Sequence, residues 1–200
     1  TMGSAVSSIA ADDNFTISAW VYMDAIDERP LFGLNAETDD HWIQFTNATV
    51  MGFKGTGVAV PLTHGLTFST GSWQHIVITR ASSNTVTVYL NGIAGGTTLT
   101  WNEAFAPDAI GTSNNGTRQY FDGRIAQVAI WDAVALPEAQ VRSIYIQGLS
   151  FNIRTTADDA LTNLQTGLVH YWTLNGVLTD PVGGGSYTLT PSANCTATGI

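Results

Sequence analysis

The sequence predicts an all-β protein: an antiparallel β-sandwich of the jelly-roll type with one or two short helices. Three observations predict it. Several short segments alternate apolar and polar residues, Gly, Asn and Ser separate them at spacings of roughly ten residues, and only 12% of the chain is charged. That charged share is about half of the usual one, which argues against a coiled coil or a disordered chain. The 200 residues suffice to bury one core.

The N-terminal half contains the clearest strand signals. Residues 15–22 (FTISAWVY) alternate strictly, which is typical of a half-buried strand. Residues 73–79 and 85–90 are rich in β-branched residues and predict a hairpin around Ser82-Ser83-Asn84. The second of these strands ends at Asn91-Gly92, a dipeptide that favours a tight turn to a further strand.

In the C-terminal half, the apolar pattern changes once from that of a strand to that of a helix. Residues 123–131 predict a strand, and residues 136–145 then predict a short helix with Pro137 and Glu138 in its first turn. A second brief helix is predicted over residues 158–164 and a strand over residues 168–174. Weaker strand signals lie at residues 42–45, 58–62 and 187–190.

Four of these segments together are similar to a known family. FTISAWV from Phe15, GSWQHIV from Gly71, VYLNG from Val88 and FDGRIAQVAIWD from Phe121 resemble the laminin G-like, pentraxin-like domains of the concanavalin A-like lectin/glucanase superfamily. The resemblance covers about residues 1–148 and implies a concanavalin A-like/laminin G-like jelly roll. We therefore predict a single domain over residues 1–200, with a family core at 1–148 and a C-terminal extension at 149–200.

One departure from the family concerns strand order. Family domains commonly begin with a strand that resembles Leu168–Asn175, whereas here this segment lies near the C-terminus. Three explanations are open: a rearranged strand order, a strand contributed by a neighbouring copy, or a chain trimmed from a longer polypeptide. We favour trimming, because Thr1 resembles the middle of a strand.

Charge and hydropathy exclude two classes of partner. Seven basic residues against 16 acidic ones give a net charge of −9, so there is no basic footprint for nucleic acid. No apolar run approaches the ~20 residues of a membrane-spanning helix, so we expect no membrane insertion. Cys195 is the only cysteine and cannot form an internal disulfide.

Calcium is a candidate cofactor. The loop that carries the metal-binding carboxylates in pentraxin-like members corresponds to residues 111–119, where no acid occurs between Asp108 and Asp122. Six acids instead gather within residues 24–40, opposed by Arg29 alone, and such a group can surround a hard cation. The candidate metal ligands among them are Asp24, Asp27, Asp39 and Asp40. The alternative is a pair of solvated acidic loops.

Aromatic residues near loops are candidate platforms for sugar rings. Trp42, Trp101 and Tyr120 lie near predicted loops, and Asn114 and Asn115 adjoin Tyr120 with hydrogen-bonding side chains. The alternative for these aromatics is packing at a sheet edge. By contrast, we expect packing roles for residues inside regular strands: Trp20, Trp73, Trp131, Trp172, His75 and His170.

These features favour binding over catalysis. No predicted strand carries two acids at alternate positions, as a glycoside hydrolase of this superfamily would, and no Gly-x-Ser-x-Gly motif occurs. We therefore predict a non-catalytic recognition or adhesion module for a glycan or another surface polymer, located extracellularly or on a virion surface. The alternative is a structural assembly protein, such as a phage capsid decoration or fibre subunit, that associates with itself or with other surface subunits; a glycoside hydrolase is a distant third.

Overall fold

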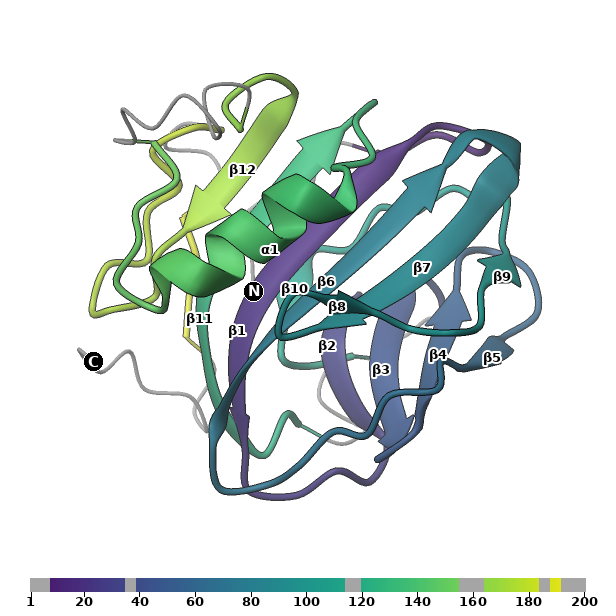
Figure 1. Ribbon diagram of the computed structural model, residues 1–200, viewed down its shortest axis with the longest axis horizontal. Helices are drawn as coiled ribbons and strands as arrows, with labels where there is room; N and C mark the ends of the chain where they lie inside the picture. Colours follow the sequence, from purple (N-terminus) through teal and green to yellow (C-terminus); the bar gives the residue numbers. More distant parts are fainter. Residues whose placement is uncertain (1–7, 35–38, 114–119, 155–163, 184–187, 192–200) are drawn as a thin grey trace.

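The chain folds into two antiparallel sheets that pack face to face, as a computed structural model shows (Figure 1). The structure describes residues 8–34, 39–113, 120–154, 164–183 and 188–191. The predicted all-β sandwich is thereby confirmed. One α-helix occurs within the described residues, and no helix there is long and apolar enough to cross a membrane.

The larger sheet has seven strands and contains most of the strands that the sequence predicts. Its order is β12-β11-β1-β6-β7-β8, and β9 also pairs with β7. Its strands are β1 (Phe15–Met23), β6 (Trp73–Ala81), β7 (Thr85–Leu90), β8 (Ile93–Ala94), β9 (Leu99–Thr100), β11 (Gly123–Asp132) and β12 (Leu168–Trp172).

The smaller sheet has five strands in the order β10-β2-β3-β4-β5. They are β2 (Arg29–Gly33), β3 (Trp42–Asn47), β4 (Val50–Lys54), β5 (Val60–Thr63) and β10 (Ala109–Ile110). The weak signals at 42–45 and 58–62 correspond to β3 and β5, but β2 and β4 were not predicted.

Two turns and the start of the helix follow the local sequence closely. Ser82–Asn84 forms a single 3₁₀ turn between β6 and β7. Asn91 and Gly92 have φ angles of 51° and 78° and join β7 to β8 in the tight turn that this dipeptide favours. The helix α1 (Glu138–Gln147) begins directly after Pro137, within two residues of the predicted start.

The main core lies between the two sheets. Alternate residues of β1, including Phe15, Ile17 and Val21, face Phe45, Phe53 and other residues of the smaller sheet. A second cluster fills the space between the outer face of the larger sheet and α1, and Trp131, Val141 and Ile144 belong to it. The helix lies across this outer face in Figure 1.

The prediction that residues 15–22 form a half-buried strand is wrong for most of its length. Every residue of β1 except Tyr22 is buried. The reason is the second layer: Trp20, on the outer face, stacks on Tyr145 of α1 at a centroid distance of 5.9 Å. Alternation correctly separates the two faces, but both are covered.

The segment after the helix returns to the larger sheet. β12 pairs antiparallel with β11, so the strand that resembles the family's first strand joins the sheet of its own chain. Residues 155–163 lie outside the described residues, and with them most of the predicted second helix. The predicted strand at 187–190 is not among the strands of the structure; in its described part the backbone N–H of Leu189 donates to the carbonyl of Leu178.

Candidate ligand-binding surfaces

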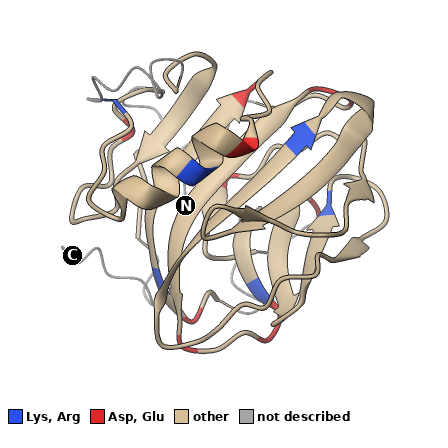
Figure 2. Ribbon diagram, viewed as in Figure 1, with Lys and Arg blue, Asp and Glu red and all other residues tan. Residues whose placement is uncertain are grey.

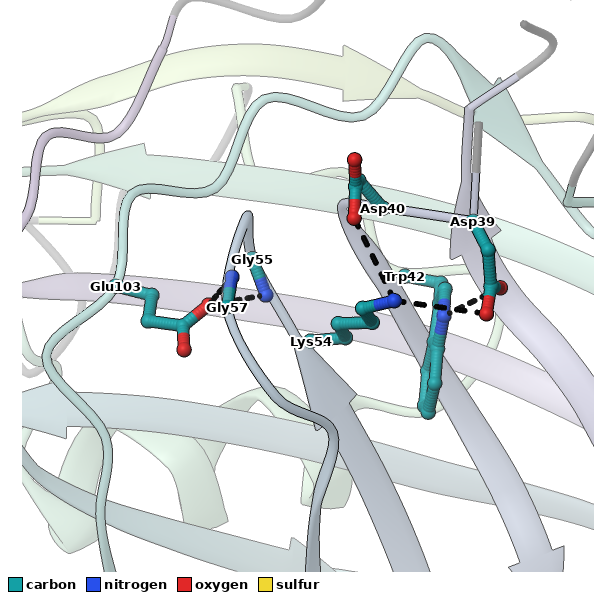
Figure 3. Close-up of polar contacts among 7 residues, drawn as sticks. All are labelled: Asp39, Asp40, Trp42, Lys54, Gly55, Gly57 and Glu103. Carbon is teal, nitrogen blue, oxygen red and sulfur yellow. Dashed lines mark hydrogen bonds and ion pairs between the residues drawn. The ribbon is translucent and has the colours of Figure 1, made fainter. Parts of the chain in front are cut away.

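A polar cluster lies at the end of β4, and we call Asp39, Asp40, Trp42 and Lys54 the Lys54 cluster (Figure 3). Nζ of Lys54 lies 3.5 Å from Oδ2 of Asp39 and 3.5 Å from Oδ1 of Asp40. Trp42, which pairs with Lys54 across β3 and β4, donates its indole N–H to Oδ1 of Asp39 over 3.0 Å. The two carboxylates that precede β3 are thus held on one ammonium group.

A neighbouring carboxylate fixes the loop that follows β4. Oε2 of Glu103 accepts hydrogen bonds from the backbone N–H groups of Gly55 and Gly57, at 2.8 and 2.9 Å (Figure 3). A Cβ at either glycine would collide with Glu103. The carboxylate of Glu103 therefore stabilises the loop that contains Gly55 and Gly57.

The structure does not bring the four candidate metal ligands together. Asp24 and Asp27 precede β2, at the end of the smaller sheet where the N–H of Glu28 donates to the carbonyl of Thr46. Asp39 and Asp40 lie at the opposite end of β2 and β3, because these strands are antiparallel. Acidic residues are spread over several loops in Figure 2, and the described part of the chain holds no group of three or more metal-ligating side chains. Calcium binding stays a prediction.

Two of the three candidate sugar platforms are buried. Trp101 is 3% exposed and packs in the main core against Phe15, Phe53 and Phe105. Trp42 is 6% exposed, and its ring lies over Gly52, where an added Cβ would come within 2.9 Å of it. The platform interpretation is wrong for both, because neither indole offers an open face for stacking.

The third candidate, Tyr120, is partly exposed. The carbonyl of Tyr120 accepts a hydrogen bond from Arg29 over 3.3 Å, which ties it to the start of β2. Asn114 and Asn115, its predicted partners, lie outside the described residues.

An open aromatic surface occurs instead on the larger sheet, and we call Trp73, Tyr22 and Arg124 the Tyr22 strip. Tyr22 pairs with Trp73 of β6 on one side and with Arg124 of β11 on the other. The rings of Tyr22 and Trp73 meet edge to face at 5.9 Å, and Cζ of Arg124 lies 4.4 Å from the Tyr22 ring centroid. Both rings are partly exposed and Arg124 is exposed.

The Tyr22 strip lies on the outer face of the sandwich. Val21 and Met23 point into the main core, so Tyr22 between them points away from it. We expected a packing role for Trp73, because it lies in a regular strand. Nothing else in the sequence indicated that it is a candidate for ligand binding. The strict alternation of residues 15–22 assigns Tyr22 to the outer face, but it does not reveal where the helix stops covering that face.

A shallow groove of ≈ 330 Å³ separates α1 from the β7–β8 turn. Its lining residues are Asn91, Gly92, Ile93, Glu138, Arg142, Tyr145 and Ile146. Ile93 and Ile146 are 64% and 68% exposed, unusually high values for large apolar side chains. The groove is thus bordered by apolar surface.

The two strand histidines have packing roles, as expected. His75 is fully buried, stacks with Trp20 and Tyr145, and shares a hydrogen bond of 2.8 Å between its Nε2 and Oγ of Ser18. Burial lowers the pKa of His75 to about 3, so it is neutral at physiological pH. His170 pairs with the buried carboxylate of Asp180.

Comparison with protein families agrees with this architecture. The family model described as the concanavalin A-like lectin/glucanases superfamily matches residues 3–142. The chain therefore belongs to this superfamily, and the resemblance drawn from the sequence is confirmed. A comparison with curated proteins gives no match.

Several solved structures share the fold at low identity. Domain 4 of AbnA, an extracellular arabinanase from Geobacillus stearothermophilus in complex with arabinotriose, is 20% identical, with a TM-score of 0.51 and 68% of each chain covered. A proposed carbohydrate-binding protein from Bacteroides ovatus is 19% identical, with a TM-score of 0.59; the match covers 90% of this chain and 55% of that one. A heptameric pentraxin from Limulus polyphemus is 13% identical, with a TM-score of 0.54 and 72% and 73% covered. At these identities the likeness concerns the fold.

Proposed function

We propose that this protein is a non-catalytic recognition module that binds glycans through the Tyr22 strip. The observation that carries the proposal is the pairing of two partly exposed aromatic side chains, Tyr22 and Trp73, on an open sheet face beside an exposed guanidinium. Aromatic faces stack on the C–H surfaces of sugar rings, while charged and polar groups nearby fix the hydroxyls. The strip is held by backbone pairing on three strands, so it is organised before the ligand arrives.

The fold relatives support this class of ligand. One similar domain is described in complex with arabinotriose and another as a proposed carbohydrate-binding protein. An extracellular or surface location suits such a module. The absence of catalysis is part of the proposal, and its support is that both carboxylates of the Lys54 cluster bind one lysine. A glycosidase needs one carboxyl group to donate a proton and a second to attack or to activate water.

The assembly role remains the second candidate, and the groove beside α1 favours it. Ile93 and Ile146 expose apolar surface on the two sides of one groove, and exposed apolar patches often mark protein contacts. An assembly subunit should form oligomers that dissociate when Ile146→Asp is introduced. Light scattering after size-exclusion chromatography measures this directly, and a monomer at all concentrations argues against the assembly role.

A glycan array with two variants tests the recognition role. We expect the affinity to fall at least about fivefold in Trp73→Ala, because stacking of one ring contributes about 1 kcal/mol or more. The matched control is Ile93→Ala, which removes an exposed apolar side chain outside the strip. Thermal unfolding shows that both variants are folded. Unchanged binding in Trp73→Ala contradicts the proposed site. If the wild type binds no glycan on the array, the recognition role itself is contradicted.

The same array addresses calcium. Binding of the wild type and of each variant is measured once with calcium and once with a chelator. Binding lost only in the chelator indicates a calcium-dependent site and points to the acidic residues within 24–40. Binding that survives chelation indicates that the strip works without a metal.

A further inference from the structure

We infer that the Tyr22 strip selects glycans that carry a carboxylate, and that Arg124 is the residue that binds this carboxylate. The inference rests on the proposed function, since it names the ligand class of the same site. It depends on three features of Arg124: its fixed position, its lack of a protein partner and its distance from Trp73.

The ring of Tyr22 fixes the position of Arg124. Cζ of Arg124 lies 4.4 Å from the centroid of that ring, within the range of a cation–π contact. Arg124 and Tyr22 are also paired in register on β11 and β1, so the backbone sets the same neighbourhood. A contact through the ring face leaves the N–H donors of the guanidinium able to bind a carboxylate with two parallel hydrogen bonds.

Arg124 lacks the carboxylate partners that Arg29 and Lys54 have. Arg29 pairs with Asp122 at 3.7 Å, and Lys54 pairs with Asp39 and Asp40. Within the described residues the guanidinium of Arg124 makes neither a hydrogen bond nor an ion pair, and the residue is exposed. An anionic group of a ligand can therefore reach it without displacing a carboxylate of the protein.

The spacing of the strip suits a short acidic oligosaccharide. Trp73 and Arg124 lie on the two strands that flank β1, about 10 Å apart at the usual strand separation. One sugar ring can contact Trp73 while the carboxylate of the next reaches Arg124. Since the chain carries a net charge of −9, a general attraction does not favour acidic ligands. Their selection must come from a local contact of this kind.

The test compares one oligosaccharide in its charged and uncharged forms. Trigalacturonic acid and its fully methyl-esterified form are titrated into the whole chain by calorimetry, and sialyllactose and its methyl ester provide a second pair. We expect the acid of a pair to bind roughly tenfold more tightly than its neutral form, the value of one charge-assisted hydrogen-bonded pair. Arg124→Gln should abolish the difference, and Arg124→Lys should restore part of it.

Two further variants separate the inference from the function on which it rests. Arg142→Gln removes an exposed arginine outside the strip and should keep the preference for acids. Trp73→Ala should weaken both forms. Equal binding of acid and neutral form by the wild type, with loss of both in Trp73→Ala, overturns the inference and leaves the function intact. A preference for acids that persists in Arg124→Gln also overturns it. If none of the four oligosaccharides binds and the wild type binds no glycan on the array, both the inference and the proposed function are overturned.

Discussion

Nδ1 of His170 lies 2.7 Å from Oδ2 of Asp180, and both side chains are buried. Oδ1 of the same carboxylate accepts the backbone N–H groups of Tyr171 and Val182, at 3.1 and 2.9 Å. Burial alone would raise the pKa of Asp180, but the hydrogen bonds from His170 and from backbone N–H groups lower it below its usual value. The pair ties the segment after β12 back onto that edge strand.

We predict that Asp180→Ala destabilises the protein by about 2–4 kcal/mol, because it leaves several buried donors without an acceptor. Urea unfolding followed by tryptophan fluorescence measures the change. The matched control is Asp27→Ala, which removes an exposed acid and should change the free energy of unfolding by less than about 0.5 kcal/mol. A similar, small effect of both variants would show that the buried pair contributes little.

Arg80 links two segments that are far apart in the sequence. It is fully buried and donates hydrogen bonds to the carbonyls of Ala10, Asp13 and Glu103, at 2.6, 2.7 and 2.6 Å. Its guanidinium also lies 4.9 Å from the ring centroid of Phe15. One side chain thus joins the segment before β1 to the loop that follows Trp101.

We predict that Arg80→Met lowers the free energy of unfolding by about 3–5 kcal/mol, since three carbonyls lose a charged donor inside the protein. Arg80→Lys should recover only part of this, because an ammonium cannot reproduce the geometry of the guanidinium. Hydrogen exchange offers a local check. The N–H groups of Ile9 and Phe105, which bond to each other's carbonyls, should exchange faster in both variants. Unchanged exchange there would contradict the joining role.

Gly92 brings the β7–β8 turn close to α1. Its φ of 78° favours glycine, and an added Cβ would lie 3.1 Å from Cα of Arg142 and 3.3 Å from Cδ1 of Tyr145. We predict that Gly92→Ala costs about 1–2 kcal/mol, from the strained φ and the displaced helix together. Gly96→Ala is the control, because nothing lies within 4 Å of its would-be Cβ. Equal thermal midpoints for the two variants would contradict the close packing.

How much of this fold the sequence predicts depends on the strand. Alternation and β-branched residues predict β1, β6 and β7 within about two residues, because the β1–β6 and β6–β7 ladders run without a register shift. The sequence did not predict β2, because Pro30 lies within it. The structure accommodates this proline at an irregularity of the sheet, because the register of β2 against β3 shifts between Pro30 and Phe32.

The candidate site was harder to predict than the fold. Trp20 and Tyr22 share the outer face of β1, yet α1 covers the first and not the second. Trp101 was expected near a loop and lies in the core, while Trp73 was expected to pack in the core or on a sheet face and is partly exposed beside Tyr22. Period-2 patterning assigns a residue to a face of a sheet. Which part of that face a distant helix covers depends on tertiary packing, which local patterns do not encode.

The buried His75 makes the stability of the protein depend on pH in a defined window. Its pKa is about 3 in the folded protein because burial disfavours the charged form, whereas an unfolded histidine has a pKa of about 6.5. Below pH 6.5 the unfolded chain therefore takes up a proton that the folded one does not. His75 stabilises the fold fully above this pH, and its contribution falls by about 1.4 kcal/mol per pH unit toward pH 3.

We predict that His75→Gln, which keeps a polar group near Ser18 but does not titrate, shows a shallower loss of stability than wild type. Urea unfolding at pH 6.0, 5.25 and 4.5 should give slopes that differ by about 1.4 kcal/mol per pH unit. Burial also lowers the pKa of His64, but His64 is present in both proteins and cancels in the difference. The window ends above pH 4, where the carboxylates of the unfolded chain begin to titrate. Parallel slopes would show that His75 takes up a proton in the folded state, contrary to its burial beneath Tyr145.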